Sequence, residues 1–248
     1  MAAITIRPAT ISDTTAIAQI HYEALQFYHD FYAAFFERHP RDLIPLATRN
    51  ALQNPEQCFL VAEQAGDTVG FARYKKAFSR NTNASDNHSQ QVTAAAAAAS
   101  IWTIKSHMKD LWNWFNERSE EIDASKEKAV DGKYHFEVMH LMVHPDHQRK
   151  GIGGLLLQSV TEKADAANAP TLIVSSTEGH GLYKKHGFES LGTWTINNEE
   201  WAHKIAEHER AIGYKDGVIA IDSDFEDKYK GIREVEDSMI RQPSIRVA

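Results

Sequence analysis

Short stretches in which apolar and polar residues alternate run through the chain, and each of them predicts a β-strand. The first covers residues 3–9, and residues 57–77 read as two strands joined by a turn at residues 65–67. Further strands are expected at residues 134–143, 169–176, 189–196 and, near the end of the chain, 238–244.

Between these strands, apolar residues recur at helical spacing. Ser12 and Asp13 offer an N-cap for a first helix, and a second, very aromatic helix is expected to run on until Pro40 stops it. Further helical segments are predicted at residues 42–54, at 102–128, after Gly151, and from residue 178 to a stop at Gly187.

The order of these elements predicts a single domain over residues 1–248. We expect an α/β (α+β) sandwich with helices on both faces of a mixed sheet. Residues 79–133 begin with a polar run and six alanines before they turn helical, so we interpret them as a helical insertion. Residues 197–233 are acidic in patches and are interpreted as a second insertion, placed before a possible last strand.

Composition narrows the class of protein. Of the 248 residues, 42% are hydrophobic and 25% charged, which fits a soluble globular protein. The formal net charge of −7 disfavours nucleic acid as a partner, and no apolar run is long enough for a membrane span. The start of the chain lacks a signal-peptide pattern, and the single cysteine, Cys58, permits no intramolecular disulfide. A cytoplasmic location is therefore expected.

A glycine-rich loop follows the predicted strand at residues 134–143. It reads Gln148-Arg149-Lys150-Gly151-Ile152-Gly153 and opens a helix. A helix N-terminus exposes unpaired N–H groups and the positive end of a dipole, and glycines there let a phosphate approach the backbone. One exposed charge–dipole contact contributes only about 0.3–1 kcal/mol, so several amides must act together on a diphosphate. The spacing matches neither the nucleoside-triphosphate loop nor the dinucleotide fingerprint.

This run resembles the acetyl-CoA signature of the GCN5-related N-acetyltransferase (GNAT) superfamily. The later segment "LIVSSTEGHGLYKKHGFESLG" is similar to that family's late strand, helix and strand, with a Leu-Tyr-x-x-x-Gly-Phe centre. The resemblance implies a GNAT-type mixed, mostly antiparallel sheet that is splayed between strands 4 and 5, with a helical insertion between strands 3 and 4. It also implies an N-acetyltransferase that moves acetyl from acetyl-CoA to a primary amine by direct attack.

The family pattern implies where acetyl-CoA lies. The pantetheine arm would bond to the backbone at the end of strand 4, and the diphosphate would rest on the loop amides. Ser176 stands where the family often has Asn, which puts side-chain help from this position in doubt. The cofactor-binding residues implied in this way are Leu141, Met142, Val143, Gln148, Arg149, Lys150, Gly151, Ile152, Gly153, Gly154 and Ser176.

Acetyl transfer to an amine needs a deprotonated amine, a donor for the oxyanion and stabilisation of the departing thiolate. By resemblance, Tyr183 is the general acid and the backbone N–H of Met142 the oxyanion donor. Glu137 has the spacing of the glutamate base used by histone acetyltransferases. His140 is nearer, but strand alternation puts it on the opposite face unless a bulge intervenes. The absence of a dedicated base is the third alternative.

The sequence does not identify the acceptor of the acetyl group. The acceptor is expected to be a small-molecule or peptide amine, approached from the side of the aromatic residues Phe27, Tyr28, Phe31 and Tyr32, which core packing explains equally well. His144 and His147 flank a proline turn without the pattern of a zinc site, so no metal is expected. An acyl-CoA-binding sensor without turnover is the alternative function. Both a monomer and a homodimer fit the sequence.

Overall fold

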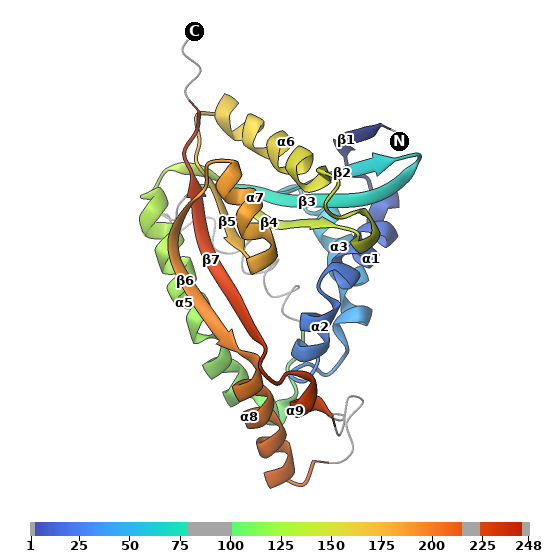
Figure 1. Cartoon of the computed structure of the whole chain (residues 1–248), viewed down its shortest axis with the longest axis vertical. Coiled ribbons are helices and arrows are strands. Elements are labelled where there is room, and N and C mark those ends of the chain that lie inside the picture. The colour runs from blue at the N-terminus through green and yellow to red at the C-terminus, as the bar shows by residue number, and fades with distance from the viewer. Residues whose placement is uncertain (1–2, 79–100, 215–223, 245–248) are drawn as a thin grey trace.

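In the part of the chain that the structure describes, one seven-stranded sheet organises the fold (Figure 1). The computed structural model describes residues 3–78, 101–214 and 224–244. The strand order is β1-β2-β3-β4-β5-β7-β6, and every neighbouring pair is antiparallel except β4 and β5. The strands are β1 (Ile4–Pro8), β2 (Gln57–Gln64), β3 (Asp67–Phe78), β4 (Tyr134–Val143), β5 (Thr171–Ser175), β6 (Glu189–Asn197) and β7 (Arg233–Arg241).

Helices cover both faces of this sheet, as the sequence predicts. On one face, α6 and α7 pack against the main apolar core, whose members include Leu156, Val160 and Tyr183. On the other face, α1 and α3 cover the half around β1 to β4, and α5 covers β7 and β6. The helices are α1 (Thr14–Ala24), α2 (Gln26–Tyr32), α3 (Pro40–Gln53), α5 (Lys109–Val130), α6 (Ile152–Ala166), α7 (Thr177–Lys185), α8 (Asn198–Ala211) and α9 (Phe225–Lys228).

The hairpin of β2 and β3 forms where the alternation places it. Its two turn residues, Ala65 and Gly66, have φ angles of 55° and 93°. Two successive residues with positive φ give the turn whose twist matches that of the flanking strands. Gly66 adopts this conformation freely, whereas Ala65 does so at a steric cost.

The second aromatic helix is shorter than the sequence predicts. It ends at Tyr32, and the chain turns through residues 33–38 before α3 begins at Pro40. The reason is a second apolar core that collects aromatic rings from distant segments. In it, the fully buried Phe31 packs on Phe115 of α5, Phe225 of α9 and Tyr229. Tertiary packing of large rings therefore overrides the local helical pattern here.

The helical part of the predicted insertion is α5, while residues 79–100 lie outside the described residues. The acidic segment contributes α8 and α9, which lie on either side of residues 215–223, a range that is also not described. In the ranges 3–78, 101–214 and 224–244, no helix combines the length and the apolar character that crossing a membrane requires.

The last strand is longer than its apolar residues suggest, and it does not lie at the sheet edge. β7 begins at Arg233, five residues before the predicted start, and inserts between β5 and β6. Its early positions carry the charged residues Arg233, Glu234 and Glu236, which the apolar pattern of the sequence does not mark as strand. This arrangement carries Glu234 and Glu236 past the end of β5, since Ser175, the last residue of β5, pairs with Asp237.

The parallel strands β4 and β5 separate soon after they meet. Only three residue pairs join them in the described structure, Phe136 with Thr171, Glu137 with Leu172 and Val138 with Ile173. Beyond these pairs, both strands continue to their carboxyl ends without pairing to one another. A register shift in the β3–β4 ladder leaves Met139 unpaired, which is the local geometry of a β-bulge. The sheet is therefore splayed between β4 and β5, as expected.

Candidate functional site

The loop between β4 and α6 presents a row of free backbone donors. Arg149 and Gly151 have φ angles of 61° and 83°, and α6 begins at Ile152. Leu155 N–H donates to the carbonyl of Gly151, but none of the N–H groups of residues 149–154 donates to another group of the described residues. These N–H groups stand at the positive end of the α6 dipole, so the loop can receive a diphosphate.

Side chains of the same loop hold it in shape. Gln148 Nε2 donates to the carbonyl of Val143 over 3.2 Å, and Lys150 Nζ donates to the carbonyl of Asp146 over 2.7 Å. Arg149 is exposed, so its guanidinium is available to an anion. A Cβ on Gly151 would meet no atom within 4 Å, which leaves open space where the cofactor is expected.

Two further glycines bring α6 close to α7. A Cβ on Gly153 would lie 3.3 Å from the side chain of Leu182, and one on Gly154 would lie 3.6 Å from that of His186. Both distances leave little room for a larger side chain. Small residues at these positions therefore set the spacing of the two helices that flank the β4–β5 gap.

Backbone groups at the end of β4 alternate between the β3 side and the gap. His144 N–H donates to the carbonyl of Val69 over 2.9 Å, so this residue turns toward β3. By strand alternation Met142 also turns its backbone groups toward β3, whereas Leu141 and Val143 turn theirs toward the gap. Leu141 and Val143 thus offer donors and acceptors to an extended ligand beside β4.

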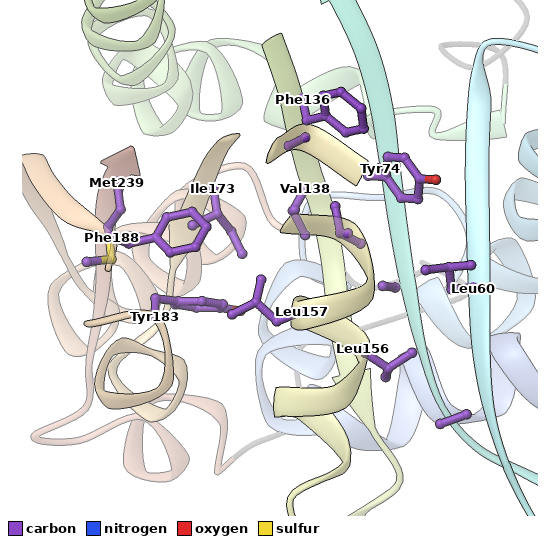
Figure 2. Packing of buried hydrophobic residues seen from close by; sticks show 14 of the residues in the cluster. Leu60, Tyr74, Phe136, Val138, Leu156, Leu157, Ile173, Tyr183, Phe188 and Met239 are labelled. Atoms are coloured by element: carbon purple, nitrogen blue, oxygen red, sulfur yellow. The ribbon is translucent and has the colours of Figure 1, made fainter. Parts of the chain in front are cut away.

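Tyr183 belongs to α7, and its ring points toward Leu157 of α6 (Figure 2). The side chain packs with Leu157 and Phe188 in the main core and is 6% exposed. Its phenol makes no hydrogen bond to a described residue, and its hydroxyl oxygen is not fully enclosed by protein. Burial raises the pKa of Tyr183, so the phenol is protonated at neutral pH.

A contact with β7 holds the first turn of α7 in place. His180 Nε2 lies 2.9 Å from Asp237 Oδ2, and Asp237 is almost fully buried. The hydroxyl of Ser190 donates to the same carboxylate. Since Tyr183 is one turn further along α7, this contact holds the helix that positions the phenol.

Gly179 lies one helical turn before Tyr183 and leaves room for its ring. A Cβ at this position would lie 2.7 Å from Cε2 of Tyr183 and 3.4 Å from its hydroxyl oxygen. We therefore expect Gly179→Ala to push the ring out of place and to lower kcat at least tenfold, with little change in the dissociation constant of acetyl-CoA. Steady-state kinetics and calorimetry check this, with Gly181→Ala as the control, because a Cβ on Gly181 of the same helix meets nothing within 4 Å.

Glu137 is paired with two lysines. Its carboxylate lies 2.6 Å from Lys75 Nζ and 2.8 Å from Lys126 Nζ. Burial opposes ionisation of Glu137, but the charges and hydrogen bonds of Lys75 and Lys126 outweigh it and lower the pKa. A carboxylate held in this way binds protons weakly at neutral pH.

The bulge in β4 brings His140 to the same face as Glu137. The two residues lie on the face that α1 covers. The ring centroid of His140 lies 4.5 Å from that of His21 on α1. Burial, with the nearby positive charge of Arg73, lowers the pKa of His140 to about 3. His140 is therefore neutral at physiological pH.

Two apolar side chains on central strands are open to solvent near the gap. Met139 is 39% exposed and Val174 is 37% exposed, although interior strands are normally covered. Ser176, which follows β5, is half-buried and begins α7, while Ser175 is enclosed and donates to the carbonyl of Ser176. The end of the gap is thus accessible between α7 and the helices on the opposite face.

A carboxylate that sequence reasoning did not select lies at this end. Glu234 Oε2 accepts a hydrogen bond of 3.0 Å from the phenol of Tyr32, which joins β7 to α2. Tyr28, also on α2, has a raised pKa, chiefly because of burial and further because of the charges of Glu178 and Glu234. Glu234 sits in an acidic stretch with no motif around it, so no sequence signal pointed to it.

No group of three or more His, Cys, Asp or Glu side chains in the described parts of the chain is arranged to hold a metal ion. His144 instead lies 3.0 Å from Glu23, and His147 Nδ1 lies 3.2 Å from the amide oxygen of Gln64. These contacts fix the loop that precedes the glycines.

Comparison with known families decides the class of this site. Residues 117–190, which run from α5 to the start of β6, match the model of the acetyltransferase (GNAT) domain. The chain carries a GNAT acetyltransferase domain. This domain class transfers acetyl from acetyl-CoA, so the protein is an acyltransferase. The match contains β4, the glycine loop, α6, β5 and α7, which together form the candidate site.

Solved structures share the fold of this GNAT protein at low sequence identity. A histone acetyltransferase HPA2-related protein from Corynebacterium glutamicum aligns at a TM-score of 0.55 with 15% identity, over 100% of both chains. A mosquito arylalkylamine N-acetyltransferase-like protein aligns at 0.57 with 14% identity, over 97% of this chain and 100% of that one. Arabidopsis thaliana NAA60, solved with a bisubstrate analogue, aligns at 0.50 with 11% identity, over 98% and 99%. No curated protein sequence matches the chain significantly.

Proposed function

We propose that this protein is an N-acetyltransferase that moves acetyl from acetyl-CoA directly to a primary amine. The observation that carries the proposal is the split between β4 and β5, because the loop with the free amides follows β4 and the helix that carries Tyr183 follows β5. The split offers an extended slot, the loop offers a diphosphate site, and the phenol offers a proton.

Acetyl-CoA is expected to bind through the backbone. Its diphosphate would rest on the N–H groups of residues 149–154, with Arg149 adding charge from the exposed side of the loop. Its pantetheine arm would lie beside β4 and bond to Leu141 and Val143, whose backbone groups face the gap. Ser176 stands at the opposite wall and is open enough to add a hydroxyl contact.

The oxyanion donor follows from the same alternation. Because Met142 directs its backbone toward β3, we assign the role to the N–H of Leu141 in place of that of Met142. Tyr183 would give its proton to the thiolate as the carbon–sulfur bond breaks. Its raised pKa makes this transfer favourable only when the attacking nitrogen, positively charged in the tetrahedral intermediate, loses a proton in the same step.

The acceptor reaches the thioester from the open end of the gap. The exposed side chains of Met139 and Val174 make this end of the gap apolar. Tyr28 and Tyr32 of α2 are expected to line it together with Glu234, to which Tyr32 is hydrogen-bonded. An amine with an apolar body fits these surroundings. Two of the similar structures are named for different acceptors, a histone and an arylalkylamine, so the fold alone does not fix the class of amine.

The test is thiol release. The protein is mixed with acetyl-CoA and, in separate reactions, an arylalkylamine, a polyamine, a lysine-containing peptide and a peptide with a free N-terminus. We expect release of CoA thiol with at least one amine, together with a product heavier by one acetyl group. Binding of acetyl-CoA without release for any amine would support the sensor alternative and reject the proposed function.

A further inference from the structure

Glu234 occupies the acceptor end of the gap because of how β7 is placed. Asp237 pairs with Ser175 at the end of β5, so the preceding residues of β7 extend beyond β5. Glu234 stands three residues before Asp237, about 10 Å along the strand. There it bonds to Tyr32 and acts electrostatically on Tyr28, which also feels Glu178 on the first turn of α7. Segments from α2, α7 and β7 thus meet around this carboxylate.

Glu234 differs from the buried carboxylates of the protein in its partners. Among the described residues, the three most enclosed carboxylates, Asp13, Glu209 and Asp237, each bond to a basic side chain. Glu234 forms no ion pair with any described residue, and its hydrogen bond comes from a neutral phenol. A desolvated carboxylate without a cation is costly, so the missing positive charge is expected to arrive with a ligand.

The groups around Glu234 explain its protonation. Burial is the main cause that raises its pKa to about 7, and the charge of Glu236 on the same strand adds to this. Tyr32 from α2, Arg118 from α5 and Asn198 from α8 act in the opposite direction. Arg118 itself is bound to Glu236 over 2.7 Å, so it does not neutralise Glu234 directly.

Asn198 supplies a second, independent sign of an incomplete polar network. Its side chain is 0% exposed, and neither amide atom completes a hydrogen bond in the described structure. The amide lies beside Glu234 and lowers its pKa through a contact that falls short of full hydrogen-bond geometry. Unsatisfied buried amides are rare in folded proteins. A cation bound at Glu234 would hold the carboxylate in its ionised form, in which both oxygens can accept a hydrogen bond from this amide.

We propose that Glu234 binds the ammonium group of the acceptor and takes one of its protons before the amine attacks acetyl-CoA. This rests on the proposed function. The ammonium R–NH3⁺ gives one proton to the carboxylate, which leaves R–NH2 and the neutral acid. The nitrogen lone pair then forms the bond to the acetyl carbon, and the carbon–sulfur bond breaks. Tyr183 protonates the thiolate, and the remaining surplus proton on nitrogen returns to the tyrosinate.

The substrate class follows from this assignment. The preferred acceptor is an amine that is protonated at neutral pH, with an ammonium group that reaches Glu234 and an apolar body that rests near Met139 and Val174. An alkylammonium has a pKa of about 10, so it cannot attack without losing a proton. Neither Glu137, held by two lysines, nor the neutral His140 is as well matched to that proton transfer.

Glu234→Gln is the decisive variant. Glutamine keeps an oxygen for the phenol of Tyr32 but removes the charge and the basicity. We expect kcat/KM for an alkylamine to fall about 100-fold or more, the range that general bases contribute. We also expect the acidic limb of the wild-type pH–rate profile, near pH 7, to disappear, with an unchanged dissociation constant for acetyl-CoA.

Two further variants separate the alternatives. Glu137→Gln removes the base that the sequence favours, and Glu226→Gln is a surface control whose partners, His203 and Arg210, lie on α8. We expect Glu226→Gln to match the wild type. If Glu137→Gln loses the acidic limb while Glu234→Gln retains it, the inference is overturned.

Acceptor basicity gives a readout that a structural role would not move. An aniline is already unprotonated at pH 7, so it needs no base to become a nucleophile. The ratio of wild-type to Glu234→Gln rates should therefore be large for an alkylamine and close to one for the aniline. An equal loss with both amines would contradict the proton-transfer role. A wild-type protein that acetylates no amine would instead reject the proposed function itself.

Stability provides a further check. Because the pKa of Glu234 is raised in the folded protein, ionisation weakens the fold as pH rises from about 4.5 to about 7, and the loss is complete above that window. Glu234→Gln should therefore melt at the same temperature as the wild type or higher at pH 8. A lower melting temperature together with weaker binding of acetyl-CoA would mean that Glu234 is structural, which would overturn the assignment.

Discussion

Replacing Tyr183 with Phe is expected to lower kcat by about 100-fold while leaving the dissociation constant of acetyl-CoA within about twofold. The ring is retained, so its packing on Leu157 and Phe188 should persist. The lost hydroxyl makes no hydrogen bond to a described residue, so the melting temperature should be unchanged or slightly higher. Rapid-mixing measurements of thiol release and calorimetric titration of the cofactor test both parts.

The same variant distinguishes an acid from a packing residue. If Tyr183 only closes the pantetheine slot, a phenylalanine ring at this position would serve equally and the rate would stay at the wild-type value. If the phenol donates the proton, the loss should shrink for an acyl donor whose thiol has a lower pKa, because that thiolate leaves without help. Equal losses for both donors would count against the acid role.

Replacing Gly151 with Val is expected to abolish measurable binding of acetyl-CoA while the fold survives. Gly151 has a φ of 83°, which costs an L-residue roughly 1–2 kcal/mol and a β-branched residue more. If the backbone relaxed to relieve this strain, the free N–H groups of the loop would no longer point toward the expected position of the diphosphate. The added side chain would also occupy the open space in front of them. Calorimetric titration with acetyl-CoA measures the loss.

Gly132 offers a matched control for that variant. It has a φ of 75° and, like Gly151, would place a Cβ within 4 Å of no atom, but it lies in the turn between α5 and β4. Gly132→Val should therefore lower the melting temperature by a similar amount and bind acetyl-CoA normally. If both variants bound the cofactor equally well, the loop would not be the diphosphate site.

The local parts of this site were predictable from the sequence, and the reason is that each depends on neighbours in the chain. The glycine loop, the strand before it and the segment around Tyr183 follow from short patterns, and their elements form where the patterns place them. The hairpin of β2 and β3 is likewise a local structure.

The parts that escaped prediction depend on contacts between distant segments. The bulge at Met139 moves His140 to the other face, and nothing in the alternation of β4 marks it. The insertion of β7 between β5 and β6 places Glu234 beside Tyr32, about two hundred residues away along the chain. Aromatic packing of Phe31 on α5 and α9 also ends α2 early. Such pairings need the three-dimensional fold to become visible.

The narrow junction between β4 and β5 has a consequence for the whole molecule. Three residue pairs connect one half of the sheet, β1 to β4, with the other half, β5, β7 and β6. A ligand bound between the unpaired carboxyl-terminal parts of β4 and β5 would act as an additional strand and would connect the two halves of the sheet. Acetyl-CoA should then slow amide hydrogen exchange in β5 most of all, and the midpoint of thermal unfolding should climb with the logarithm of its concentration.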